Sequence, residues 1–192
     1  MHINAQAQGF SLFELLIVVI LLAVIMSFAI PQYIAIKNQA HTASVEAVAG
    51  GFSSAVGMVR GQWELEGRTH KLLKNAFVNY GGVIVGVDAE TGMPTSDETT
   101  NDTRVQAITV KKCQQVFNVI LQDSPSSTLS DKEAVIKSAR FLVRYNAVSK
   151  QCIYYLTHFI DIKNIPINGE VTPQTVGFSY FPVTGKVHIF KN

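Results

Sequence analysis

The side chains that could bind a metal ion or act on a substrate are few and are scattered along this sequence. His158 and Asp161 lie three residues apart, but their segment reads as the end of a strand, so they need not share a face. His188 alternates with apolar neighbours and is expected to face solvent. His41 and His70 each stand alone. The histidines therefore predict no metal centre and no general base.

The acidic residues give no better candidate for a metal site. Asp88, Glu90, Asp97 and Glu98 could meet a calcium ion, but no ligand spacing is enforced, and we expect them to lie in solvated turns. The sequence has no GxSxG, GxxxxGK[ST], GxGxxG or HExxH motif. We therefore predict no catalytic residue, no metal and no cofactor, and we do not expect an enzyme.

The two cysteines, Cys113 and Cys152, belong to no CxxC pair, which excludes a four-thiolate zinc site. In an exported domain they would read as one disulfide, and in a cytosolic protein as two free thiols. The net charge is only +2, and Lys111 and Lys112 are the only adjacent basic residues. Because nucleic-acid-binding proteins gather basic residues on one face, no nucleic acid partner is indicated.

A long apolar segment lies near the N-terminus, and Glu14 is its only formally charged side chain from Phe10 to Ile30. A helix of this length spans about 31 Å, close to the ~30 Å hydrocarbon core of a bilayer. A secretory signal would need a basic start and a shorter apolar stretch. A plain anchor leaves Glu14 unexplained, since a carboxylate in an apolar span costs about 2.5–3.5 kcal/mol on insertion scales.

The stretch Gly9-Phe10-Ser11-Leu12-Phe13-Glu14-Leu15-Leu16 closely resembles the processing signal of type IV prepilins. The resemblance implies that a membrane peptidase cuts between Gly9 and Phe10 and methylates the new amine of Phe10. It also implies that Glu14 attracts this amine on a neighbouring subunit, because a matched pair costs less than an unpaired charge at low dielectric. Pro31 stands where many members have a helix-distorting proline, which removes one helical hydrogen bond.

The resemblance implies several partners: prepilin peptidase, other pilin subunits, an inner-membrane assembly platform and membrane lipid. It implies a single-pass protein of the inner membrane with a periplasmic head, which later joins a pilus on the cell surface. In such a head we expect Cys113 and Cys152 to be bonded, with two free buried thiols as the alternative. The leader MHINAQAQ departs from the family pattern, because it has only His2 where Lys or Arg is usual.

The helical pattern continues beyond Pro31 to about Glu66 and is expected to stop at Gly67. Apolar residues form one stripe at helical spacing: Val45, Val48, Phe52, Val56, Val59 and Trp63. We interpret the glycines of this segment, Gly50, Gly51, Gly57 and Gly61, as places of close packing against a sheet, with bending during assembly as the alternative.

The remaining chain predicts a second helix from Arg104 to Leu121, a short strand at Val83–Val85 and a loop from Thr91 to Asp102. Four further strands are expected to form two hairpins: Arg140–Tyr145 with Cys152–Thr157, and Val176–Phe181 with Lys186–Phe190. This order predicts an α+β fold with a long helix packed on a mostly antiparallel sheet, the ladle shape of type IV pilins. The expected parts are a leader (1–9), a membrane and polymerisation helix (10–31), its amphipathic continuation (32–66) and a head (67–192).

Three functions are weighed. The first is a pilin subunit of a filament that supports surface attachment, and the aromatic-rich stretch FLVRYNAVSKQCIYYL resembles pilins of the mannose-sensitive haemagglutinin type. The second is a pseudopilin of a type II secretion system, against which the expected disulfide and the lack of a clear calcium loop argue. The third is a membrane-anchored periplasmic enzyme or binding module, for which Glu14 and the Gly9-Phe10 junction would be coincidences.

Overall fold

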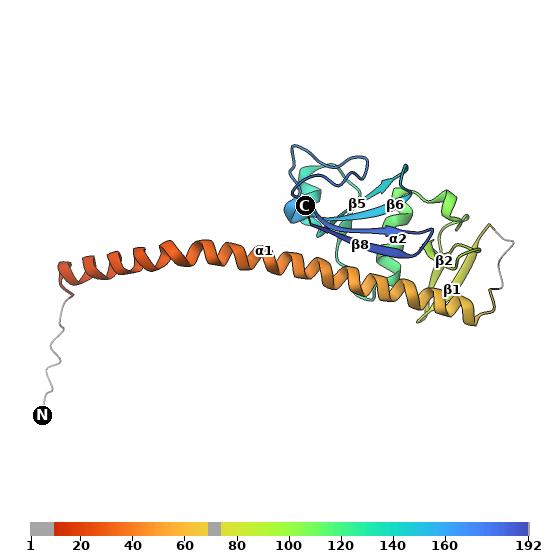
Figure 1. Cartoon of the computed structure of the whole chain (residues 1–192), viewed down its shortest axis with the longest axis horizontal. Coiled ribbons are helices and arrows are strands. Elements are labelled where there is room, and N and C mark those ends of the chain that lie inside the picture. The colour runs from red at the N-terminus through yellow and green to blue at the C-terminus, as the bar shows by residue number, and fades with distance from the viewer. Residues whose placement is uncertain (1–9, 69–73, 192) are drawn as a thin grey trace, which may run out of the picture. The chain divides into compact units, whose positions relative to one another are not determined.

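The computed structural model describes residues 10–68 and 74–191, and the chain divides into two compact units between His41 and Thr42. Helix α1 (Leu12–Leu65) contributes to both units (Figure 1). The first unit is the N-terminal part of this helix. The second unit contains the rest of α1 and all the strands.

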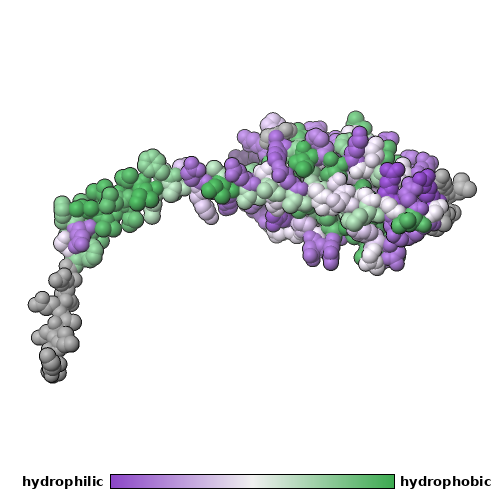
Figure 2. Space-filling view, turned by 60° about the horizontal axis from the view of Figure 1, so that its bottom comes forward, coloured by the Kyte–Doolittle hydropathy of each residue, from purple (hydrophilic) through white to green (hydrophobic). Residues whose placement is uncertain are grey.

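In the first unit, every described side chain from residue 10 to residue 40 is exposed. Leucine, isoleucine, valine and phenylalanine cover all sides of the N-terminal stretch of the helix, which Figure 2 shows as mostly hydrophobic, and polar side chains become frequent nearer the head. By its length and composition the helix could cross a membrane. Exposed apolar side chains in such a run need either lipid or other proteins around them, because water disfavours them by about 25 cal/mol per Å².

The second unit is built on two sheets, and its core agrees with the predicted α+β class. The larger sheet has the order β4-β5-β6-β7-β8, with β4 parallel to β5 and all other neighbours antiparallel. The smaller sheet is an antiparallel β1-β2-β3 meander. The strands are β1 (Ala76–Tyr80), β2 (Val83–Val87), β3 (Pro94–Asp97), β4 (Ser127–Thr128), β5 (Phe141–Asn146), β6 (Gln151–Leu156), β7 (Val176–Phe181) and β8 (Lys186–Lys191).

Helices cover both faces of the larger sheet. The second half of α1 and helix α2 (Val110–Ile120) pack on the face that presents Tyr154 and Phe178. Helix α3 (Glu133–Ser138) packs on the other face through Ile136, beside Tyr155. Because both faces are buried, β5 and β6 are apolar at successive positions and do not alternate.

The predicted stripe of α1 forms the centre of the core, except that Val48 is only half-buried and Ala49 and Ala55 are buried instead. Phe52 lies among four aromatic rings, with centroid distances of 5.2 Å to Tyr180, 5.4 Å to Phe178, 5.5 Å to Tyr154 and 6.3 Å to Phe117. Tilted and offset rings at such distances add to the stability that area burial alone provides.

The interpretation of the α1 glycines as packing positions is wrong for three of the four. A Cβ atom added at Gly50, Gly57 or Gly61 would meet nothing within 4 Å, and one at Gly51 would only touch Leu121. These glycines lie on the helix face opposite the buried stripe. By contrast, Gly92 has a φ of +70° and packs directly against the Trp63 ring, so this turn does require glycine.

Three predicted boundaries also need correction. The second helix starts at Val110 and not at Arg104, because the Thr109 side chain caps it by accepting from the Lys112 N–H at 3.3 Å. Residues Val105–Ala107 form a separate 3₁₀ turn, η1. The predicted loop from Thr91 to Asp102 contains β3, and the strand predicted at Val83–Val85 continues to Val87.

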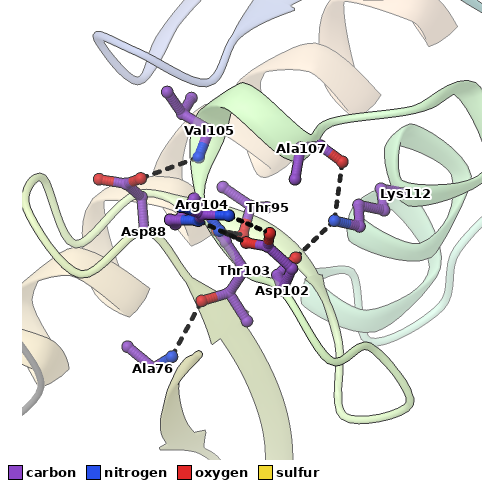
Figure 3. A network of polar contacts seen from close by, with 9 residues as sticks. All are labelled: Ala76, Asp88, Thr95, Asp102, Thr103, Arg104, Val105, Ala107 and Lys112. Carbon is purple, nitrogen blue, oxygen red and sulfur yellow. Dashed lines mark hydrogen bonds and ion pairs between the residues drawn. The ribbon is translucent and has the colours of Figure 1, made fainter. Parts of the chain in front are cut away.

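A polar network fixes the segment between β3 and α2 (Figure 3). Lys112 Nζ donates to the carbonyl oxygens of Asp102 and Ala107, and Arg104 donates through two nitrogens to the Asp102 carboxylate. On the other side, the Ala76 N–H donates to Thr103 Oγ1 at 2.9 Å. The segment is therefore joined to α2 at one end and to β1 at the other.

Candidate processing and assembly site

The first turn of α1 is capped by Ser11. Its hydroxyl accepts from the Glu14 N–H at 3.1 Å, and its carbonyl accepts from the Leu15 N–H at 3.1 Å. Ser11 and Glu14 have the spacing of a capping box, a sequence signal that marks where a helix begins. The sequence analysis missed this role of Ser11, although the Ser-x-x-Glu pattern before an apolar run could have revealed it.

Capping places the carboxylate of Glu14 in the first turn of the helix. An anionic side chain is favoured there, because unpaired N–H groups give a helix N-terminus partial positive charge. Glu14 is exposed and has no ion pair with any residue that the structure describes. A carboxylate so placed on an apolar surface can therefore pair with a cation from outside the chain.

Phe10 directly precedes this turn, and 71% of its surface is exposed. The predicted cleavage junction joins it to Gly9, which lies outside the described residues, as does the whole predicted leader 1–9. Cleavage, methylation of Phe10 and pairing with Glu14 accordingly remain predictions. So do the predicted limits of the membrane segment at residues 10 and 31.

Pro31 lies inside α1, and the helix continues through it. It lines a shallow pocket of about 370 Å³ with Phe28, Gln32 and Ala35, which all share one helix face. Since proline has no N–H, it cannot donate the helical hydrogen bond to Ser27. Distortion of the helix at this point remains a prediction.

The head contains a disulfide between Cys113 of α2 and Cys152 of β6, with their Cα atoms 5.5 Å apart. Both residues are buried, and the Tyr154 hydroxyl donates to the Cys113 carbonyl at 2.8 Å. The bond and this contact hold α2 against the sheet. Complete burial raises the pKa of Tyr154 well above its ordinary value, so the phenol stays a donor.

Two of the acidic residues considered as calcium ligands, Asp88 and Asp97, accept hydrogen bonds from nearby backbone N–H groups in turns. Asp88 is buried, and its carboxylate accepts from the N–H groups of Glu90, Thr91 and Val105. Asp97 Oδ1 accepts from the Thr99 N–H at 3.0 Å. Among residues 10–68 and 74–191, no group of three or more His, Cys, Asp or Glu side chains could hold a metal ion.

The remaining titratable candidates are also separated by the fold. His158 lies in the 3₁₀ turn η2 (Thr157–Phe159) against the Phe159 ring, with centroids 5.1 Å apart. Asp161 accepts from the Lys163 N–H and the Asn164 side chain in the next turn. His188 is exposed on β8, as predicted.

Comparison with known proteins bears on the N-terminal segment. The prokaryotic N-terminal methylation motif matches residues 4–30, which include Phe10, Ser11 and Glu14. The type IV narrow pilus major component PilA5 of Thermus thermophilus is 36% identical over 50 residues, which cover 26% of this chain and 43% of that protein. The match therefore spans less than half of that relative. No solved structure matches the chain.

The matched motif and this relative agree with the resemblance to type IV pilins, and the matched residues include the apolar start of the long helix α1. The likeness to type IV pilins rests on this N-terminal segment of the chain. Neither comparison bears on the predicted mannose-sensitive haemagglutinin subgroup, which stays a prediction.

Proposed function

We propose that this chain is a structural subunit of a type IV pilus, cut after Gly9, methylated at Phe10 and polymerised through α1. The observation that carries the proposal is Glu14, an exposed carboxylate in the first turn of an apolar helix, within the matched methylation motif. An uncut anchor would have no use for this charge. In a bundle where a neighbouring subunit brings a free amine to this helix, the carboxylate would have a partner.

The mechanism follows from the energies of the two charges. Cleavage frees the amine of Phe10, four residues before Glu14 and at the same end of the helix. Within one low-dielectric bundle, a carboxylate without a partner is costly, whereas a matched amine offsets much of that cost. Attraction between Glu14 of an incoming subunit and Phe10 of its neighbour then favours the stagger that brings the two charges together.

The proposal also names the proteins that act on the chain and the compartments in which it resides. The peptidase and the assembly platform act while α1 lies in the inner membrane with the head in the periplasm. Lipid first covers the exposed apolar side chains of residues 10–40, and other subunits replace lipid in the filament. The filament supports surface attachment, the chain acts as no enzyme, and its subgroup is the mannose-sensitive haemagglutinin type.

The test is the mass of the N-terminal peptide, measured on protein from sheared surface material and from membranes. An N-methylated Phe10 in the sheared fraction is expected. Gly9→Leu is the matched control, because a bulky residue at the junction should leave the precursor uncut and confined to membranes. A methylated terminus found only in wild-type membranes would instead indicate a pseudopilin. An intact N-terminus would refute processing and leave an anchored domain.

A further inference from the structure

A groove runs between α2 and the three-stranded sheet of the head, with a cavity volume of about 600 Å³. Side chains of β2 and of the C-terminal part of α2 give it an aliphatic surface: Val83, Ile84, Val119 and Leu121. Each of these four side chains is at least partly exposed to solvent. The volume lies within the range of protein sites that accept a small ligand or an inserted side chain.

The polar wall of the groove is held in place before anything binds. Gln115 Nε2 donates to Asp97 Oδ1 at 2.8 Å and to Thr99 Oγ1 at 3.0 Å. About one turn further along α2, Asn118 Oδ1 accepts from the Ser127 hydroxyl at 3.3 Å. Preorganised side chains lose little entropy on association, so this wall favours a defined occupant.

The groove also has a definite charge. Its only ionisable lining residues are Asp97 and Glu98, and no lysine or arginine of the described chain lines it. Glu98 is exposed and makes no ion pair within the described residues. An occupant that suits the groove therefore has an aliphatic group for the floor and a positive charge for this rim, whereas an anion is repelled.

The chain itself presents such a group at the tip of the β5–β6 hairpin. Val148 is 95% exposed, and Lys150 is exposed two residues later. The tip is rigid, because Asn146 Oδ1 accepts from the N–H groups of Val148 and Ser149 at 3.0 Å each. Asn146 Nδ2 also donates to the Gly169 carbonyl at 3.2 Å. A single exposed valine is common on protein surfaces, but a rigid valine near a lysine that makes no ion pair within the described residues matches this groove in both apolar surface and charge.

We propose that the β5–β6 tip of one copy of this chain docks in the α2 groove of a second copy. Val148 packs on the aliphatic floor, and Lys150 pairs with Glu98 and Asp97 at the rim. Groove and tip are different surfaces of one molecule, so the contact is heterologous and, in a helical filament, repeats from copy to copy without closing. The inference rests on the proposed function, since such a contact would join heads along a filament whose core is formed by α1.

Cysteine cross-linking tests the contact in assembled full-length chains. Cys113 and Cys152 are already bonded, and the described residues include no free cysteine. The double variant Val148→Cys/Gln122→Cys places one thiol on the tip and one on the groove. Sheared filaments of this variant should give a ladder of dimers and higher multiples on a non-reducing gel, and the ladder should disappear with reductant.

The matched control moves the first thiol to another hairpin. Val183 is an exposed valine in the turn between β7 and β8, so Val183→Cys/Gln122→Cys carries the same chemistry at the wrong tip. This control and each single variant should give only monomers. Cross-links to a protein of another mass would assign the groove to a different occupant and overturn the proposal.

Charge reversal gives a second measurement. Lys150→Glu should lower the amount of pilin in the sheared fraction several-fold, and Lys150→Glu/Glu98→Lys should restore it. Lys163→Glu, at an exposed lysine that belongs to neither the tip nor the groove lining, should have no effect.

The outcomes separate the two proposals. If wild-type chain is absent from sheared filaments, the proposed function fails, and the docking fails with it. If filaments form but no tip-specific ladder appears and charge reversal changes nothing, the docking alone is overturned.

Discussion

The Ser11 hydroxyl accepts a hydrogen bond from the Glu14 N–H at 3.1 Å, so the residue that starts the helix also fixes the turn that carries the charge. We expect Glu14→Gln to abolish or strongly slow polymerisation, because the amide keeps the shape of the side chain and removes its attraction for an amine. The measurement is the ratio of processed chain in sheared filaments to processed chain in membranes.

Glu46→Gln is the matched control on the same helix. Glu46 pairs with Lys191 at the surface of the head, and a surface ion pair contributes only about 0–1 kcal/mol. This variant should assemble like the wild type. Normal incorporation of the Glu14→Gln chain into filaments would refute the assembly role of Glu14.

Much of the fold could be predicted because the sequence signals were local. The long helix, its apolar stripe and the hairpins of the larger sheet follow from the periodicity of apolar residues and from turn residues. Strand β3 could not be predicted in this way, since Thr95 and Ser96 are fully buried although both are polar. Thr95 Oγ1 donates to the distant Thr103 carbonyl at 2.6 Å, a partner that local pattern does not reveal.

The proposed functional residues also fall into those that local sequence signals reveal and those that they do not. Phe10 and Glu14 could be singled out from residue types and spacing alone. The groove and the β5–β6 tip could not, because Val83, Gln115 and Gln122 come together only when α2 packs beside the smaller sheet. The interpretation of the α1 glycines as packing positions failed for Gly50, Gly57 and Gly61, because their spacing was not compared with that of the buried stripe.

The disulfide should contribute strongly to the stability of the head. A bond between Cys113 and Cys152 closes a loop with a sequence separation of 39, for which the chain-entropy model gives about 4 kcal/mol. We expect Cys113→Ser to lower the free energy of unfolding by roughly this amount, measured by urea denaturation of the full-length chain in detergent. Reductant should shift wild-type protein toward the variant and leave the variant unchanged. Equal midpoints for oxidised wild type and variant would show that the bond adds nothing.

Asp102 gives a prediction for acid pH. Hydrogen bonds from the Arg104 side chain, more than any other cause, lower the pKa of Asp102 from 3.8 to about 2. A carboxyl group with a lower pKa in the folded state stabilises the fold above its unfolded pKa, and this stability is lost as the pH falls through the folded value.

The stability difference between wild type and Asp102→Asn should therefore be constant from about pH 5 to 7 and shrink between about pH 4 and 2. Urea midpoints at a series of pH values measure it. Asp123→Asn is the control, because Asp123 is exposed and has no hydrogen bond given by a side chain of the described residues. A difference that stays constant down to pH 2 would refute the protective role of Arg104.

Phe52 should be the most sensitive position of α1 within the head. Its side chain is fully buried among Phe117, Tyr154, Phe178 and Tyr180, so truncation leaves a cavity bounded by rigid rings. We expect Phe52→Ala to reduce the free energy of unfolding by about 3–5 kcal/mol. Near-ultraviolet circular dichroism with urea denaturation measures this loss, since it follows the packing of the aromatic rings.

Leu65→Ala serves as the comparison, because Leu65 is 83% exposed at the end of the same helix. It should change the free energy of unfolding by no more than about 0.5 kcal/mol. If the two variants were equally stable, the second half of α1 would not be part of the cooperative core. The long helix would then hold the head by its chain connection alone, and forces on α1 in a filament would not be transmitted through the packing of Phe52.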